Sequence, residues 1–446
     1  MGRKKVKSMK KITKSICLLS LLWGVNVWAA PKTGLPIEEL RTFAQVYNAI
    51  KQGYVESVSD KEMISNAISG MLSRLDPHSS YLDNDAFKDL QESTQGEFGG
   101  LGIEVVMEDG LVKVVSPIED SPAFKAGLLS GDLIFKIDDT LIKGMSFIDA
   151  VKKMRGKPGT VVKISVMREK TKEPLEFQLK REVIRVKSVK AKKVEEHYAW
   201  VRITQFQENT LEDLVKYLNR LNQETTLKGI LLDLRNDPGG LLNAAIGVSS
   251  VFLDKNLKIV STDGRTPESR QEFFSRGQFY LRANQKDPID SLPMSVRKLP
   301  MVVLVNSGSA SASEIVAGAL QDYKRAQIVG TQTFGKGSVQ TILPLPNNTG
   351  IKLTTARYFT PKGRSIQAKG ITPDVLIEET EKGTGLRLRE ADLTGHLKNQ
   401  KEQEAPKMDV KNGNKEADEA VRRLEFGSQN DFQFQKALSL LKQKAP

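Results

Sequence analysis

The stretch from Asn306 to Glu314, NSGSASASE, decides the fold because it joins an apolar strand to a helix. The residues before it, 301–305, read MVVLV and are apolar at every position, which is typical of a buried parallel or mixed strand. Residues 314–323 then have the spacing of a helix. The small residues between the two allow a tight strand-to-helix turn with exposed side chains.

Strands and helices alternate on both sides of this turn, from about residue 185 to 375. The pattern predicts strands at 199–203, 229–234 and 327–329 and a helix at 210–221. This alternation is typical of an α/β domain. The stretch 264–299 is polar and contains several Pro and Gly, so we expect it to lie outside the core sheet.

The serines of the turn are candidates for a nucleophile. Backbone N–H groups at the start of a helix present the positive end of its dipole. A serine there can attack a carbonyl group while a neighbouring N–H supplies half of an oxyanion hole. Ser309, Ser311 and Ser313 all fit this description, and they could instead be linker and N-cap residues.

A serine nucleophile needs a base, and the chain offers two kinds. Of its three histidines, only His78 is close to a distinctive motif, although segment 76–78 is also a simple helix stop. The other candidate is Lys336, which has a glycine on either side, as close backbone packing requires. Burial must lower the pKa of a lysine base from about 10.4 towards 7, a difference of roughly 4 kcal/mol. Gln340 could orient the neutral amine without adding charge.

Residues 330–336 also match the start of a phosphate-binding loop, Gly-x-x-x-x-Gly-Lys. Position 337 is glycine, whereas such a loop needs Ser or Thr there. The following residues, 338–344, alternate like a strand and end in proline, whereas a phosphate loop leads into a helix. We therefore reject a nucleotide-binding function.

A Pro-Gly-Gly turn follows the apolar run 229–234. The accessible backbone N–H groups of this turn could supply a second oxyanion donor, and a plain turn explains the same residues equally well. No His, Asp and Glu residues have the spacing of metal ligands, and Cys17 is the only cysteine. We assign no metal and no other cofactor.

Three further regions have distinct patterns. Residues 35–75 have helical spacing and predict two helices joined near 53–60. Residues 96–182 open with a glycine-rich stretch and predict a small α+β module of about five strands and two helices. Residues 378–430 are rich in Lys, Glu, Gln and Asn, so we expect them to be mainly exposed, and 432–444 predict a terminal amphipathic helix.

The chain has 446 residues and a formal net charge of +13, but its first 29 residues carry seven Lys or Arg and no acid. The other 60 basic and 54 acidic residues make an ordinary solvated surface, which argues against nucleic-acid binding. An apolar run at 16–28 and then Ala29-Ala30-Pro31 follow the basic stretch, which is the pattern of an export signal. We expect cleavage after Ala29, and the alternative is a membrane anchor that is not cut.

Together these segments resemble the carboxyl-terminal processing peptidases, also called tail-specific proteases, which are serine endopeptidases with a Ser-Lys dyad. The resemblance runs from about residue 75 to 374 and rests on five motifs. They are LDPHSSYL at 75–82, GLGI at 100–103, DLRNDPGG at 233–240, GSASASE at 308–314 and TFGKGSVQ at 333–340.

The resemblance implies roles for individual residues. In this family the middle serine of Ser-Ala-Ser-Ala-Ser is the nucleophile, which corresponds to Ser311. The base corresponds to Lys336, and Gln340 corresponds to the glutamine that orients it. The family's oxyanion donors correspond to the backbone N–H groups of Ala312 and Gly240.

The resemblance also implies a fold and a kind of substrate. It identifies the α+β module as a PDZ domain, which captures the C-terminus of a protein substrate. Leu101, Gly102 and Ile103 are expected around the substrate carboxylate, with the following strand as an edge for β-augmentation. Arg168, expected on the last strand of this domain, is a candidate for a regulatory contact. The catalytic core is expected to be a crotonase-like α/β fold into which the PDZ domain is inserted.

The sequence therefore predicts an extracytoplasmic, for example periplasmic, serine endopeptidase that recognises apolar C-terminal tails of proteins. The alternative is an inactive PDZ scaffold that binds C-terminal peptides. An adaptor protein, a second copy of the chain and peripheral or signal-anchored membrane association are partners to be tested. The expected segments are a signal peptide at 1–29, a helical region at 30–95, a PDZ domain at 96–184, a peptidase core at 185–377 and a charged C-terminal region with a terminal helix at 378–446.

Overall fold

The computed structural model describes residues 35–118, 120–169, 171, 173–381, 383, 388–399 and 425–444. The predicted export signal at 1–29 lies outside the described residues. The chain divides into two units, one that ends at Ile64 and one that begins at Ser65, and each is described by itself. Among the described residues, every helix is too short or too polar to cross a bilayer.

The two predicted N-terminal helices are confirmed as α1 (Ile37–Gly53) and α2 (Asp60–Ser73). Asp60, the first residue of α2, accepts hydrogen bonds of 2.6 Å from Tyr47 and from Lys51, both on α1. No residue of α1 is buried, so its apolar side chains are largely exposed.

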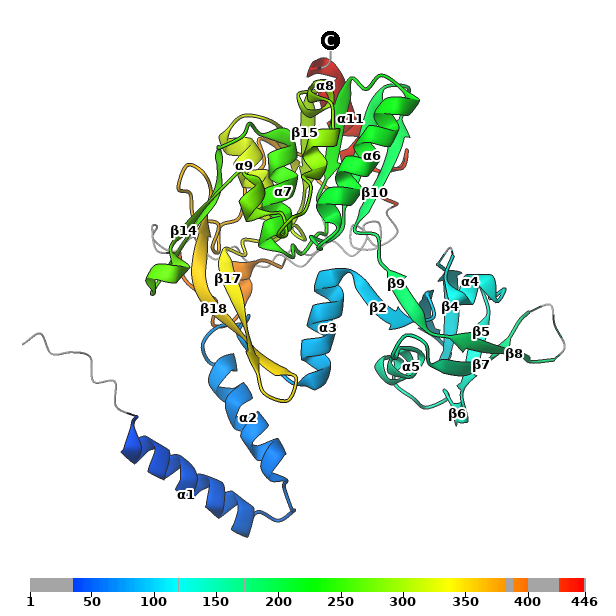
Figure 1. Ribbon diagram of the computed structural model, residues 1–446, viewed down its shortest axis with the longest axis vertical. Coiled ribbons are helices and arrows are strands. Elements are labelled where there is room, and N and C mark those ends of the chain that lie inside the picture. Colours follow the sequence, from blue (N-terminus) through cyan, green and yellow to red (C-terminus); the bar gives the residue numbers. More distant parts are fainter. Residues whose placement is uncertain are drawn as a thin grey trace, which may run out of the picture. The chain divides into compact units, whose positions relative to one another are not determined.

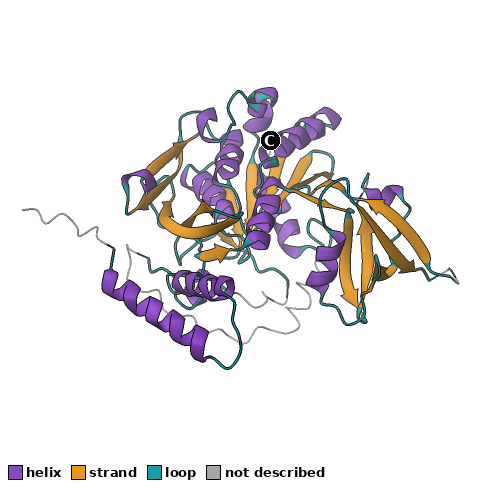
Figure 2. Ribbon diagram, turned by 60° about the horizontal axis from the view of Figure 1, so that its bottom comes forward, coloured by secondary structure: helices purple, strands orange, loops and turns teal. Residues whose placement is uncertain are grey.

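The predicted α+β module has its own sheet and its own core. Its strands are β2 (Glu97–Gly100), β3 (Ile103–Glu108), β4 (Leu111–Pro117), β5 (Leu133–Ile137), β6 (Thr140–Leu141), β7 (Val161–Met167), β8 (Leu175–Lys180) and β9 (Glu182–Arg185). The main sheet has the order β3-β4-β5-β7-β8, with β6 paired to β5, while β2 pairs with β9. The two predicted helices are α4 (Pro122–Lys125) and α5 (Phe147–Met154), and Figure 2 distinguishes these helices from the strands. The short β2, β6 and β9 add to the five predicted strands.

The connections that carry Ser311 and Lys336 leave strands of a second, six-stranded sheet. Its strands, in sheet order, are β10 (Val189–Val194), β11 (Tyr198–Ile203), β12 (Gly229–Asp233), β15 (Met301–Val305), β16 (Gln327–Gly330) and β19 (Val375–Leu376). All neighbours are parallel except β10 and β11. The carboxyl ends of β12 and β15 therefore meet at one edge of the sheet, where ligand sites of α/β proteins are usually found.

Helices cover both faces of this sheet, as the continuous apolar strands predicted. One face carries α6 (Thr210–Glu224), α7 (Leu242–Phe252) and α9 (Ala312–Asp322), and the other carries α11 (Phe432–Lys444). Figure 1 shows α7 and α9 side by side. Along β12, Ile230 and Leu232 pack in the core with the three helices, while Leu231 packs with Phe434 of α11. The terminal helix predicted at 432–444 is confirmed.

A third sheet holds the strand that follows Lys336. Its members are β1 (Ser80–Leu82), β18 (Thr349–Phe359), β13 (Lys258–Gly264) and β14 (Gln271–Phe274) in sheet order, with β17 (Ser338–Leu345) also paired to β18. Helix α3 (Asn84–Gln95) lies against β1 and β18. Residues 264–299 lie outside the six-stranded sheet, as expected. Within them, β14 belongs to the third sheet through its pairing with β13, and the short helix α8 (Met294–Arg297) comes later in the chain.

The prediction that residues 378–430 are mainly exposed is wrong for part of the described tail. Glu390, in the short helix η4 (Glu390–Asp392), has no exposed surface. Its backbone N–H donates to Phe334 O at 3.0 Å, and its carboxylate accepts a hydrogen bond from Gln367 at 2.9 Å. Composition could not show this burial because the partners of Glu390 come from distant parts of the chain.

A buried ion cluster attaches α11 to the core sheet. The guanidinium of Arg235, which is fully buried, lies 2.6 Å from carboxylate oxygens of both Asp233 and Asp431 and 4.6 Å from the ring centre of Phe426. Burial alone would raise the pKa of Asp233, but the charge and hydrogen bonds of Arg235 outweigh it and hold that pKa below its usual value. The cluster is therefore ionic, and each charge depends on its partners.

Removing Asp431 should destabilise the protein strongly. A buried charge that loses its partner costs about 3–5 kcal/mol, and we expect Asp431→Ala to lower the free energy of unfolding by about that amount. Urea unfolding followed by circular dichroism measures the change. Glu195→Ala is the matched control, because Glu195 pairs with Lys442 of α11 at the surface, where such pairs contribute about 0.2–1 kcal/mol. Equal losses in the two variants would contradict the role of the buried cluster.

Candidate active site

The turn from β15 to α9 holds two of its three serines by buried hydrogen bonds. Ser309 Oγ donates to Leu234 O at 2.8 Å, and Ser313 Oγ donates to Asp237 O at 3.0 Å. Both serines are fully buried, whereas Ser311 is partly exposed. Two of the three candidates therefore have structural tasks, which leaves Ser311 as the serine that a substrate could reach.

Ser311 has a strained backbone at the start of α9. Its φ is 53° and its ψ is −110°, a combination that residues with a side chain rarely adopt. Strain of this kind costs about 1–3 kcal/mol and is concentrated at functional sites. The first N–H groups of α9, including that of Ala312, have no partner within the helix, so the strained turn presents Ser311 beside backbone donors.

One buried carboxylate joins the serine turn to the lysine loop. Glu314 Oε2 accepts hydrogen bonds from the backbone N–H of Ser311 at 2.8 Å and from that of Lys336 at 2.9 Å. Its other oxygen, Oε1, accepts from Thr333 Oγ1 at 2.6 Å and from the N–H of Gly335 at 2.7 Å. Ser311 and Lys336 are therefore neighbours, because their backbones share a single oxygen atom.

Glu314 has no exposed surface, and burial raises its pKa to about 7. The hydrogen bonds from Thr333, Gly335, Ser311 and Lys336 act in the other direction, because they favour the ionised carboxylate. Protonation at acid pH would replace an acceptor with an O–H group and weaken the connection between the two loops.

Lys336 lies between β16 and β17 with its side chain partly buried. Burial lowers its pKa below the usual value, and the positive charge of Lys352 lowers it further, although Glu390 and Glu314 oppose this shift. A Cβ atom on the following residue, Gly337, would come within 2.2 Å of a backbone nitrogen. The close backbone packing expected around this lysine is therefore confirmed.

The Pro-Gly-Gly turn lies directly against Ser311. Gly239 and Gly240 both have positive φ, 102° and 143°. A Cβ atom at Gly239 would lie 2.8 Å from Ser311 Cβ and 2.9 Å from the nitrogen of Ala312. The bridge between this turn and Phe206 uses the carbonyl of Gly239 and the N–H of Leu241, so the Gly240 N–H takes no part in it. Position 239 requires glycine because the backbone at this position lies so close to Ser311.

Gln340 and His78 are both engaged with other side chains. The amide nitrogen of Gln340 donates to Ser338 Oγ at 3.0 Å and to Thr354 Oγ1 at 3.2 Å, so its orienting role towards Lys336 stays a prediction. His78 Nε2 lies 2.7 Å from a carboxylate oxygen of Glu390. This contact gives His78 a task other than that of a base for Ser311.

The expected carboxylate-binding loop of the PDZ module leads into an edge strand. Gly102 has a φ of 73°, and a Cβ atom there would lie 2.2 Å from Ser121 Cβ. Its carbonyl accepts hydrogen bonds from the Ile118 N–H at 2.8 Å and from Ser121 Oγ at 3.0 Å. Leu101 is buried, Ile103 begins β3, and β3 is the first strand of its sheet. An edge strand has unpaired N–H and C=O groups that a peptide can use.

The prediction that Arg168 lies on the last strand of this module is wrong. Arg168 follows directly after β7, and β8 and β9 come later. Its guanidinium makes two hydrogen bonds of 2.7 and 2.8 Å to the Asp132 carboxylate and one of 2.9 Å to Gly127 O. The hydrogen bonds that Arg168 donates to Asp132 raise the pKa of Arg168.

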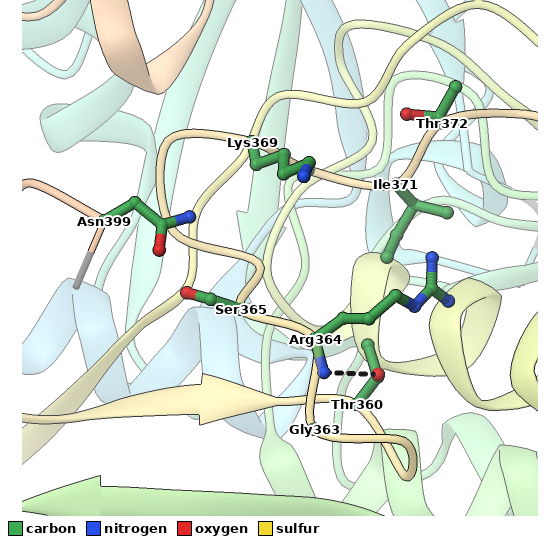
Figure 3. Close-up of a pocket in the computed structure, with 9 residues that line it drawn as sticks. Thr360, Gly363, Arg364, Ser365, Lys369, Ile371, Thr372 and Asn399 are labelled. Carbon is green, nitrogen blue, oxygen red and sulfur yellow. Dashed lines mark hydrogen bonds between the residues drawn. The ribbon is translucent and has the colours of Figure 1, made fainter. Parts of the chain in front are cut away.

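A cavity of about 210 Å³ lies beside the loop that follows β18 (Figure 3). Most of its lining comes from residues 360–372, and Asn399 comes from the described tail. None of the predicted catalytic residues lines it. In the described part of the chain, no cluster of His, Cys, Asp and Glu could hold a metal ion.

Three functional candidates were missed from the sequence: Glu314, Glu390 and Asp237. Glu314 could have been found, because Ser311-x-x-Glu314 has the spacing of a capping box at the start of a helix. Glu390 and Asp237 gave no local signal, since their importance comes from burial and from contacts made in the fold.

The chain matches known families along most of its length. Residues 197–377 match Peptidase family S41, residues 99–179 match the PDZ domain, and residues 26–86 match the Activating protease CtpB N-terminal domain. It is 47% identical over 372 residues to the carboxy-terminal-processing protease of Bartonella bacilliformis, covering 82% of each chain. It is 36% identical to the carboxy-terminal processing protease CtpB of Bacillus subtilis, covering 76% of this chain and 67% of that one.

A solved structure, the photosystem II D1 C-terminal processing protease, is 29% identical and covers 77% of this chain and 87% of its own, with a TM-score of 0.43. The class that the site and the family and sequence matches define is a serine-type peptidase with a PDZ domain. The chain belongs to peptidase family S41 and, within it, to the carboxy-terminal processing proteases.

Replacing Glu314 by glutamine should reduce the catalytic rate. Whichever way the glutamine amide is turned, its NH₂ group would face two groups that now donate hydrogen bonds to the carboxylate. Each buried donor left without an acceptor costs about 1–3 kcal/mol. We expect kcat to fall more than about tenfold while KM changes little, measured with a peptide substrate. Glu224→Gln, a half-exposed position at the end of α6, is the control, and a Glu314→Gln enzyme with wild-type kcat would contradict the role of this carboxylate.

Proposed function

We propose that the protein is an endopeptidase in which Ser311 and Lys336 form a catalytic dyad. The observation that carries this proposal is the shared Oε2 atom of Glu314, which holds both backbones against one carboxylate oxygen. The lowered pKa of Lys336 supports it further, because only the neutral amine can accept the serine proton. Gln340 is proposed to orient that amine.

In the proposed reaction, Ser311 Oγ forms a bond to the scissile carbonyl carbon and its proton passes to Lys336 Nζ. The backbone N–H groups of Ala312 and Gly240 stabilise the negative oxygen of the tetrahedral intermediate. When the C–N bond breaks, Lys336 gives the proton to the leaving amine. Lys336 then takes a proton from the water that attacks the ester carbonyl, and it gives this proton to Ser311 Oγ as the C–Oγ bond breaks.

The PDZ domain is proposed to select substrates by their C-terminal tails. A tail would pair with the free edge of β3, and its carboxylate would meet the backbone amides around Leu101, Gly102 and Ile103. Apolar tails are favoured because this loop is followed by apolar strand residues. Arg168 is proposed as a regulatory contact, which would require the pair with Asp132 to change.

The remaining proposals concern fold details and location. The core is proposed to be crotonase-like, with the PDZ domain at 96–184 inserted between the helical region at 30–95 and the core at 185–377, and with the C-terminal region at 378–446. An export signal at 1–29 would direct the chain to the periplasm or another extracytoplasmic compartment. An adaptor protein, self-association and peripheral or signal-anchored membrane association are proposed as further partners.

Loss of either dyad side chain should abolish cleavage. We expect Ser311→Ala and Lys336→Ala to lower kcat/KM more than about 10³-fold, because neither half can act alone. Lys336→Arg should be as inactive, since arginine keeps its proton. Cleavage of a protein substrate is followed by electrophoresis and mass spectrometry, with Ser307→Ala and Lys255→Ala as controls. Wild-type cleavage by Ser311→Ala would show that another nucleophile acts.

The free carboxylate of a substrate tail should matter for recognition. We expect a peptide ending in an amide to be cleaved at least about tenfold less efficiently than the same peptide with a free carboxylate, mainly through KM. The reason is that an amide lacks the negative charge that the loop amides accept. An excess of an uncleavable tail peptide with a free carboxylate should inhibit cleavage of the free-acid substrate but not of the amide substrate. Equal kcat/KM for both substrates would refute recognition of the terminal carboxylate.

A further inference from the structure

Asp237 is a buried acid that the proposed mechanism does not use. It lies between β12 and the Gly239-Gly240 turn and has no exposed surface. Its Oδ1 accepts a hydrogen bond of 2.9 Å from the N–H of Gly239. Its Oδ2 is buried and has no hydrogen-bond partner in the part of the chain that the structure describes.

The backbone of Asp237 is attached to the serine turn. Its carbonyl accepts hydrogen bonds of 3.0 Å from both the Ala310 N–H and Ser313 Oγ. The residue that its carboxyl group holds, Gly239, packs directly against Ser311 Cβ. Asp237 therefore fixes the turn that faces the nucleophile, and any charge on it would act close to the developing oxyanion.

The surrounding charges do not compensate an ionised Asp237. Arg202, on β11, is itself buried and lies 3.4 Å from Asp233, while Arg235 is held by Asp233 and Asp431. A carboxylate oxygen without a partner is far more costly when charged than when neutral. Burial accordingly raises the pKa of Asp237 to about 8, against the hydrogen bond from Gly239, the nearby hydroxyl of Ser313 and the charge of Arg202.

We propose that Asp237 is a positioning residue that works in its protonated form, and that its ionisation limits activity at alkaline pH. This inference rests on the proposed dyad and oxyanion hole. The neutral acid keeps the Gly239 hydrogen bond and fixes the turn, whereas the ionised acid places negative charge beside the position where a second negative charge must form. The two charges repel each other in a site with little water.

The direction of the pH effect separates Asp237 from the other titrating groups of the site. Deprotonation of Lys336 yields the neutral base, and deprotonation of Glu314 yields the full acceptor of four hydrogen bonds. Both events raise the rate as pH increases. Ionisation of Asp237 acts in the opposite direction and alone produces a loss.

The test is the pH dependence of kcat/KM for the wild type, Asp237→Asn and Asp237→Ser. For a group that titrates near pH 8, the ratio of the wild-type kcat/KM to that of each variant should fall about tenfold between about pH 7 and 9, because the rise due to Lys336 and Glu314 is common to all three proteins. Both variants keep an acceptor for the Gly239 N–H but cannot ionise. Neither variant should show the decline that ionisation of Asp237 causes in the wild type. Circular dichroism at each pH confirms that the three proteins are folded.

The outcomes distinguish this inference from the proposed function. A ratio of wild-type to variant kcat/KM that stays constant between about pH 7 and 9, so that the profiles run parallel, would overturn the role of Asp237. The serine variant decides the question if the asparagine variant does not fold. Absence of any cleavage that depends on Ser311 would instead overturn the proposed dyad.

Discussion

The candidate active site depends on one buried acceptor, the carboxylate of Glu314. Its two oxygens hold the backbone of the serine turn and the backbone of the lysine loop, which leave the sheet from different strands. Glu314 belongs to the first turn of α9, and α9 packs into the core beside α7. The packing of one helix therefore fixes the position of Glu314, and Glu314 in turn fixes the spacing between Ser311 and Lys336.

Local patterns predicted the elements that support this arrangement. Strand β15 is buried on both faces, so it is apolar at every position and the sequence predicts it directly. Helix α11 is buried on one face, which gives the amphipathic pattern that predicts it. The choice of Ser311 came from the family resemblance. The structure adds a physical reason for choosing Ser311, because the hydroxyl groups of Ser309 and Ser313 already donate hydrogen bonds to backbone carbonyls.

What could not be predicted depends on contacts between distant residues. Arg235 and Asp431 are 196 positions apart, and His78 and Glu390 are 312 apart. No periodicity or motif connects such pairs, and the charged composition of the tail favoured exposure instead. Arg168 was misplaced for a similar reason, since the order of strands in the PDZ domain decides which strand is last.

The charges around Lys336 oppose one another, because burial and Lys352 favour the neutral amine while Glu390 and Glu314 favour the ammonium ion. The balance between them decides whether the dyad can work. The most direct measurement is a nuclear magnetic resonance titration of Lys336 Nζ in the folded protein. We expect a midpoint below the ordinary lysine value of 10.5. A midpoint at or above that value would mean that the ammonium form persists, and Lys336 could not be the base.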